Sequence, residues 1–273
     1  MSLILLVIFF VLGLIIGSFL NVVIFRMNTS RSLGGRSSCM SCFKTLLWYE
    51  LIPLFSFLGL RGRCRSCKTR ISVQYPLVEL FTGIIFALLF LKFQNILYFS
   101  FFSFTFIYVY YAMIFSILIV ITVYDLRHKI IPDMLSFIFG ALAFIGLFLF
   151  SNNVLTDQTG IYLHMPSVLE LFSGILVAFP FAFFWFISSG RWMGFGDAKL
   201  AVGIGYLLGI AGAFSGLVIA FYSGAIVGLC LIIFSKIYGG HYKLKSEIPF
   251  APFLVLGTIL AFLFEINFFF FNF

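Results

Sequence analysis

The chain has 273 residues, of which 63% are hydrophobic and 10% are charged, and its mean hydropathy is +1.18. Soluble domains carry about 25% charged residues, so this composition excludes an ordinary soluble protein and indicates a protein embedded in a membrane. The formal net charge of +8 does not require a nucleic-acid partner, because basic residues at the edges of a membrane favour anionic lipid headgroups.

Apolar stretches long enough to cross a bilayer recur along the chain and predict an all-α polytopic membrane protein with about eight transmembrane helices. The first span has no Lys or Arg before it and Arg26 directly after it. This order is the reverse of a cleavable signal peptide, so we expect a retained helix. The predicted spans are residues 3–25, 77–91, 96–123, 134–150, 168–190, 199–213, 215–235 and 249–272.

The division between the sixth and seventh spans depends on glycines. Residues 200–234 are almost continuously apolar, and only Gly209, Gly212 and Gly216 suggest a break.

Basic residues are distributed unevenly between the two sides that these spans define. If the N-terminus lies outside, all of the 17 Lys and Arg residues except Lys92 fall on the inner side. The positive-inside rule makes that side cytoplasmic. The outer loop at residues 151–167 carries Asp157 and His164 but shows no recognisable motif.

The loop at residues 26–76 is polar, basic and rich in cysteine. About fifty residues rarely build a self-sufficient core, so a stabilising cross-link or metal is expected. Cys39, Cys42, Cys64 and Cys67 form two C-x-x-C pairs separated by 21 residues, which is the spacing of a four-thiolate zinc site. We therefore expect a small cytoplasmic zinc-ribbon-like subdomain with structural zinc. Two disulfides, which a reducing cytoplasm disfavours, or free thiols are the alternatives.

Two of the nine acidic residues, Asp125 and Asp197, lie at the cytoplasmic edges of predicted helices. A carboxylate near the bilayer core costs about 2.5–3.5 kcal/mol, so its position suggests chemistry. Two facing carboxylates can hydrolyse a peptide bond when one is ionised and the other protonated, and close like charges create that asymmetry. Gly194 and Gly196 would let a substrate strand approach the backbone beside Asp197.

Ordinary structural roles are open for the same carboxylates. Asp197 and Asp133 could each cap the N-terminus of the helix that follows. Asp125 could be an interfacial anchor paired with Arg127 or Lys129. The sequence contains no D-T-G or D-S-G motif, which argues against the soluble pepsin-like design.

Several motifs together resemble the type IV prepilin peptidases, which are GxGD aspartyl membrane proteases. The resemblance covers nearly the whole chain. The motifs are Gly17-Ser18-Phe19-Leu20-Asn21-Val22-Val23, the cysteine quartet, Tyr75-Pro76-Leu77-Val78-Glu79, Asp125 through Ile131-Pro132-Asp133, Met193-Gly194-Phe195-Gly196-Asp197-Ala198-Lys199-Leu200 and Ile248-Pro249-Phe250-Ala251-Pro252-Phe253.

This resemblance implies that Asp125 and Asp197 are catalytic, and that Asp133, Gly194, Gly196 and Lys199 support them. It implies removal of the basic leader of prepilins and pseudopilins after a Gly, on the cytoplasmic face of the bacterial inner membrane. Zinc binding by the cysteine quartet is also expected of such proteins.

The resemblance further implies methylation of the new N-terminal residue with S-adenosylmethionine. Glu50 and Glu79 are the acidic residues near the cysteine-rich loop that could bind the donor or position the amine, but surface or capping roles fit them equally well. We expect a first helix at residues 1–25, a zinc-binding and methyltransferase-associated region at 26–76, and a peptidase domain at 77–273.

Two other classes of function fit parts of the pattern. A transporter or channel could relay protons through its membrane carboxylates, but such proteins place them near the midplane, often in inverted repeats that this chain lacks. A noncatalytic assembly factor could recruit partners through its cysteine loop.

Overall fold

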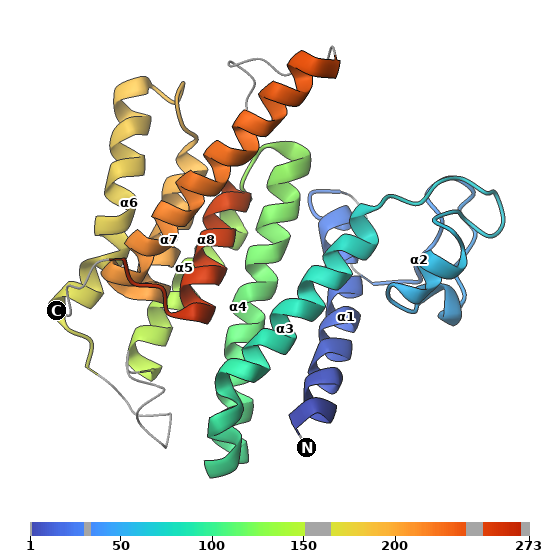
Figure 1. The fold of residues 1–273 in the computed structure, drawn as a ribbon, viewed down its shortest axis with the longest axis horizontal. Helices are drawn as coiled ribbons and strands as arrows, with labels where there is room; N and C mark the ends of the chain where they lie inside the picture. The colour runs from blue at the N-terminus through green and yellow to red at the C-terminus, as the bar shows by residue number, and fades with distance from the viewer. Residues whose placement is uncertain (1, 30–33, 151–164, 239–247, 269–273) are drawn as a thin grey trace. The chain divides into compact units, whose positions relative to one another are not determined.

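The computed structural model describes residues 2–29, 34–150, 165–238 and 248–268, which excludes Asp157 and His164. Its regular structure in these ranges is helical, and the only β pairing there consists of two isolated bridges (Figure 1). This confirms the predicted all-α class. The helices are α1 (Ser2–Arg26), η1 (Trp48–Leu51), α2 (Phe55–Gly59), α3 (Gln74–Phe99), α4 (Phe101–His128), α5 (Asp133–Leu149), α6 (Val168–Ser188), α7 (Phe195–Tyr238) and α8 (Ala251–Phe264).

Five helices of the described chain, α1, α3, α4, α6 and α7, are long and apolar enough to cross a membrane. The helices α5 and α8 are also apolar but have 17 and 14 residues. The long α7 is interrupted at Gly209, whose φ of 67° and ψ of 178° are not helical. The break predicted from the glycines is therefore present, and it falls at the first of them.

Helix boundaries differ from the prediction around the third span. The predicted gap before residue 96 is absent, and α3 continues to Phe99. Ser100 then caps α4, because its hydroxyl accepts a hydrogen bond from the backbone N–H of Ser103 at 3.3 Å. At its other end α4 continues to His128, five residues beyond the predicted end at residue 123, so Asp125 lies within the helix.

Met1–Asn95 together with Tyr108–Val120 form one compact unit. In this unit α1 packs on α3 through small residues: a Cβ added at Gly13 would lie 2.7 Å from Cβ of Phe86. The rings of Phe9 and Phe90 stack beside this contact, with centroids 4.8 Å apart. Glycine therefore allows the two helix backbones to approach closely.

Ile96–Ile107 and Ile121–Phe273 form the second compact unit, in which α7 packs against α5, α6 and α8. Figure 1 shows α6, α7 and α8 side by side. A Cβ at Gly205 of α7 would lie 2.6 Å from the carbonyl oxygen of Ser173 of α6, and the Ser173 hydroxyl donates to the Gly205 carbonyl at 3.0 Å. These contacts hold the helix that carries Asp197.

Candidate functional site: a carboxylate pair and a cysteine cluster

Asp125 is a buried carboxylate in the last turn of α4, with 4% of its surface exposed. The carboxylate takes a hydrogen bond from the backbone N–H of Ala251, the first residue of α8. The first N–H groups of a helix have no partner inside the helix, so Asp125 satisfies one of them. Its Oδ2 atom is buried and has no hydrogen-bond partner among the described residues.

Asp197 is the third residue of α7 and is 8% exposed. Its carboxylate interacts electrostatically with that of Asp125, although the two residues come from different helices. Its backbone N–H donates to the Gly194 carbonyl at 3.3 Å. The fold of the second unit thus brings the two predicted aspartates within range of a charge–charge interaction.

The turn before Asp197 packs closely against the segment before α5. A Cβ at Gly196 would lie 2.9 Å from Cβ of Ile131, so this glycine allows α7 to begin against the segment before α5. A Cβ at Gly194 would lie 3.8 Å from Oδ2 of Asp197, which is an ordinary contact. The expectation that Gly196 leaves room for a substrate is therefore wrong, because Ile131 occupies that space.

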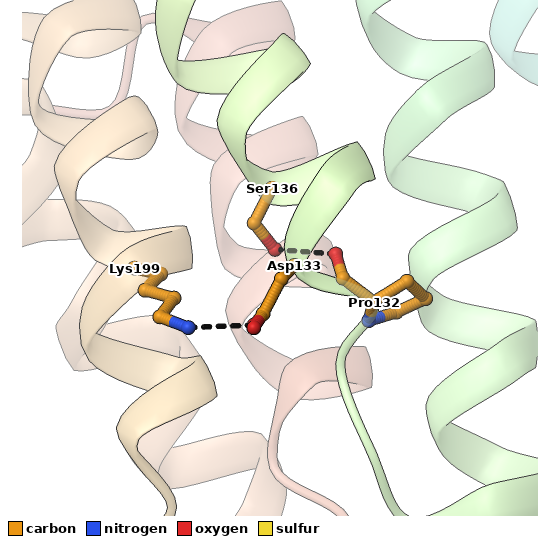
Figure 2. Close-up of polar contacts among 4 residues, drawn as sticks. All are labelled: Pro132, Asp133, Ser136 and Lys199. Carbon is orange, nitrogen blue, oxygen red and sulfur yellow. Dashed lines mark hydrogen bonds and ion pairs between the residues drawn. The ribbon is translucent and has the colours of Figure 1, made fainter.

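Asp133 and Lys199 form an ion pair between the first residue of α5 and the first turns of α7 (Figure 2). Nζ of Lys199 donates to Oδ1 of Asp133 at 2.6 Å, and Nζ also lies 5.2 Å from the centroid of the Phe195 ring. The sequence suggested these two residues as supporting positions, but it gave no sign that they contact each other.

Neither Asp133 nor Asp197 is the N-cap of a helix. Asp133 is inside α5, and Pro132 precedes it as the N-cap without a side-chain cap. Asp197 is inside α7, which begins three residues earlier than an N-cap at this position would require. The hydroxyl of Ser136 bonds to the Pro132 carbonyl at 3.2 Å, as Figure 2 also shows.

The four cysteines predicted to bind metal lie together in the first unit. The sulfur atoms of Cys39, Cys42, Cys64 and Cys67 are all within 4.8 Å of one another, and Sγ of Cys39 lies 3.7 Å from Sγ of Cys67. Tetrahedral zinc with Zn–S bonds of about 2.3 Å needs sulfur atoms about 3.8 Å apart. The cluster therefore has the donor set and the spacing of a closed metal site.

Each C-x-x-C pair is a tight turn of the same design. The backbone N–H of Cys39 donates to the Lys44 carbonyl at 3.0 Å, and that of Cys64 donates to the Thr69 carbonyl at 2.8 Å. In each turn the fifth residue adopts a positive φ, 56° at Phe43 and 59° at Lys68. The two turns consequently direct two sulfur atoms each toward a common point.

Hydrogen bonds prepare two of these thiols for ionisation. The hydroxyl and backbone of Thr69 lower the pKa of Cys67 to about 6, and Sγ of Cys67 lies 3.3 Å from the Thr69 hydroxyl. Backbone hydrogen bonds at Cys42 and Ser41 lower the pKa of Cys39. Thiolates are the form that binds metal.

Glu50 and Glu79 both hold backbone groups of the cysteine-rich loop. Oε2 of Glu50 accepts from the N–H of Leu47 at 2.8 Å, at the start of η1. Glu79 is 7% exposed, and its Oε2 accepts from the N–H of Leu54 at 2.9 Å. Leu54 has a φ of 60°, so Glu79 fixes a strained turn of the loop to α3.

Comparison with known proteins agrees with this arrangement. The bacterial peptidase A24 N-terminal domain matches residues 11–93, and the type IV leader peptidase family matches residues 112–233. A prepilin leader peptidase/N-methyltransferase from Bacillus subtilis is 32% identical over 94% of this chain and 93% of its own length. The chain belongs to the type IV leader peptidase family.

Other relatives with the same name support the assignment. The protein from Myxococcus xanthus is 36% identical over 82% of this chain and 62% of its own length. The protein from Neisseria gonorrhoeae is 27% identical over 85% of this chain and 82% of its own length. No solved structure matches the chain. Family membership makes the chain a multi-pass membrane peptidase of a bacterial family and displaces the transporter and assembly-factor alternatives.

Proposed function

We propose that this chain is an aspartyl endopeptidase that removes the basic leader of type IV prepilins and pseudopilins after a Gly. Asp125 and Asp197 are its catalytic residues. The observation that carries the proposal is the pairing of two buried carboxylates from different helices in a chain with only nine acidic residues.

The pair suits acid–base hydrolysis because two close carboxylates hold one proton between them. The ionised carboxylate takes a proton from a water molecule, whose oxygen attacks the scissile carbonyl carbon. The protonated carboxyl donates to the carbonyl oxygen, and a proton then passes to the leaving amine as the C–N bond breaks. The N–H of Ala251 orients Asp125, while Oδ2, which has no hydrogen-bond partner among the described residues, could interact with a water or a substrate atom.

The pair faces the cytoplasm in this proposal. Asp125 lies at the end of α4 and Asp197 at the start of α7, so both are at the ends of apolar helices, where water would be expected to reach them in a membrane. The basic loops predicted on the same side support this orientation. A substrate cut just before its apolar helix would present its scissile bond at that edge.

Purified Asp125→Asn and Asp197→Asn variants test the assignment. Each is expected to remain folded and to stop leader removal from a prepilin, read by intact mass. Asp157→Asn, in the predicted outer loop, is the matched control and should cleave normally. Normal cleavage by either of the first two variants refutes the catalytic pair.

The methyltransferase activity named in the relatives is proposed for this chain as well, with S-adenosylmethionine as donor and residues 26–76 as the region associated with it. Glu50 and Glu79 do not form a binding site for S-adenosylmethionine by themselves, because each carboxylate already accepts a hydrogen bond from a backbone N–H group of the loop. We therefore assign no transfer step to them. Addition of one methyl group to the cleaved prepilin, only when S-adenosylmethionine is present, tests the activity.

Zinc is proposed as the metal of the cysteine cluster, with a structural role. Cys39, Cys42, Cys64 and Cys67 would hold it, and four sulfur ligands would leave no position for water or substrate. Bound zinc would fix the two turns of a loop that has little apolar core of its own. A quadruple Cys→Ser variant that keeps one metal per chain contradicts the proposal.

The positions of these sites support the proposed division of the chain into functional regions. Residues 77–273 contain both aspartates and form the peptidase domain, and residues 26–76 contain the cysteine cluster. The first helix, residues 1–25, precedes them.

A further inference from the structure

The cysteine-rich loop of the first unit is attached to the side of α3, close to the end from which the loop leaves (Figure 1). The N–H of Leu54, the residue before α2, donates to Oε2 of Glu79, which is the sixth residue of α3. At 1.5 Å per residue, Glu79 lies about 7.5 Å along the helix from Gln74. The start of α2 is therefore fixed beside the second turn of α3.

This position on α3 corresponds to the edge of a bilayer. The helix has 26 residues and is about 39 Å long, whereas the hydrocarbon core of a bilayer is about 30 Å thick. When α3 spans this core centrally and upright, each of its ends extends about 4.5 Å beyond the core, and Glu79 lies about 3 Å inside the boundary. The start of α2 is then at the level where lipid headgroups meet the hydrocarbon.

The side chains that α2 and η1 expose at this level are apolar. Phe55 and Leu58 of α2 are 71% and 70% exposed, and a spacing of three residues places them on the same face of the helix. η1 contacts α2 and exposes Trp48, which is 76% accessible. Trp is enriched at membrane interfaces, because its amphipathic ring suits the headgroup level.

Arginine side chains lie next to these apolar residues. Nη1 of Arg65 donates to the hydroxyl of Tyr49, whose ring packs edge-on against Trp48 with centroids 5.7 Å apart. Arg63 and Arg70 are opposite each other in an isolated antiparallel bridge, where like charges repel. Within the described part of the chain, no carboxylate pairs with either of these two arginines.

The loop keeps a positive charge even when the proposed zinc is counted. Residues 34–73 contain seven Lys and Arg residues and a single acidic residue, Glu50. A zinc ion with four thiolates contributes a charge of −2, which leaves the loop at about +4. A positively charged surface with exposed aromatic side chains complements a leaflet that contains anionic lipids.

We propose that an aromatic–basic surface on the cysteine-rich loop binds the anionic phospholipids of the adjacent leaflet. The apolar side chains enter the outer part of the hydrocarbon, and the guanidinium groups donate hydrogen bonds to lipid phosphate oxygens. The inference does not depend on the peptidase activity. The surface consists of Trp48, Phe55, Leu58, Arg63, Arg65 and Arg70.

The fluorescence of Trp48 tests the proposal with the full, zinc-loaded chain in nanodiscs. The chain has three Trp residues, so Trp185→Phe with Trp192→Phe leaves Trp48 alone. The nanodiscs contain phosphatidylcholine only, or phosphatidylcholine with about 30% phosphatidylglycerol as the anionic lipid. Each type is prepared with and without lipid brominated near the headgroup end of its acyl chains, because bromine quenches a Trp that contacts it.

Brominated lipid should quench Trp48 strongly in the anionic nanodiscs and weakly in the neutral ones. Each basic residue near an anionic surface changes binding by about fivefold, so Arg63→Gln with Arg70→Gln should lower the ratio of membrane-bound to free loop by about 25-fold. Lys92→Gln, near the other end of α3, is the matched control and should leave the quenching unchanged. Equal quenching in neutral and anionic nanodiscs, or quenching that survives the double substitution, overturns the proposal.

A second measurement keeps all of the arginines and tryptophans. A photoreactive phenylalanine in place of Phe55 should cross-link to phosphatidylglycerol, also when prepilin is present in excess. The same group in place of Phe57, which packs against Gly62 in the same helix, is the control and should cross-link within the chain. Cross-links from position 55 to prepilin or to a second copy of the chain, in place of lipid, would identify a protein-binding surface and refute the proposal. Prepilin cleavage in the same sample tests the proposed function separately.

Discussion

Gly196→Ala should misplace Asp197 through a single added carbon. The new Cβ would lie 2.9 Å from Cβ of Ile131, whereas ordinary contacts begin at 3.4 Å, so the two segments must separate by about 0.5 Å. The atom it meets is attached directly to the backbone, and rotation of a side chain cannot relieve the clash. The start of α7 must therefore move relative to the segment before α5.

This displacement should reduce catalysis more than stability. Overpacking typically costs about 1–3 kcal/mol, and a misplacement of about 1 Å in a catalytic group can cost about 100-fold. For a shift of roughly half that size we expect kcat to fall by about tenfold to 100-fold. The assay is leader removal at saturating prepilin, with thermal unfolding in detergent measured in parallel.

Two comparison variants separate this explanation from a general effect of alanine in the motif. Gly194→Ala adds a Cβ at an ordinary 3.8 Å from Oδ2 of Asp197, so its thermal stability should equal that of the unaltered chain. Ile131→Gly removes the carbon that clashes and should restore part of the activity of Gly196→Ala. Full activity of Gly196→Ala, or no recovery in the double variant, would refute the steric explanation.

Three further outcomes are expected. Lys199→Ala removes the ion pair with Asp133, and because both side chains are partly exposed, the free energy of unfolding should fall by no more than about 1 kcal/mol in a denaturant titration. Metal binding displaces the protons of four thiols, and the pKa of Cys42 is raised to about 11 while hydrogen bonds with Thr69 lower the pKa of Cys67 to about 6, so metal affinity measured by competition with a chelator should decrease steadily as the pH falls from neutral through 6. Glu79→Ala should increase hydrogen exchange at the N–H of Leu54, whereas Glu79→Gln, which keeps an acceptor oxygen, should not.

The sequence predicted the helical class and the cysteine cluster because both depend on local signals. Long apolar runs indicate spans, and the spacing of Cys39, Cys42, Cys64 and Cys67 is itself a metal-binding pattern. The cluster is present in the structure, with its sulfur atoms close together.

Other features depend on contacts between distant segments, and the sequence could not supply them. The predicted span ended at residue 123, where polar residues begin, but α4 continues to His128. The partner of Lys199 is Asp133 on another helix, which residue type alone does not specify. The reason for Gly196 is likewise a tertiary contact with Ile131 and not an opening for substrate.

The arrangement of helix ends explains why a carboxylate pair can exist in so apolar a chain. Asp197 lies in the first turn of α7, and Asp125 accepts an N–H from the first residue of α8. The N-terminus of a helix carries a partial positive charge and unpaired N–H groups, both of which stabilise a nearby carboxylate. The two helix N-termini thus help to offset the cost of burying both carboxylates in an otherwise apolar chain.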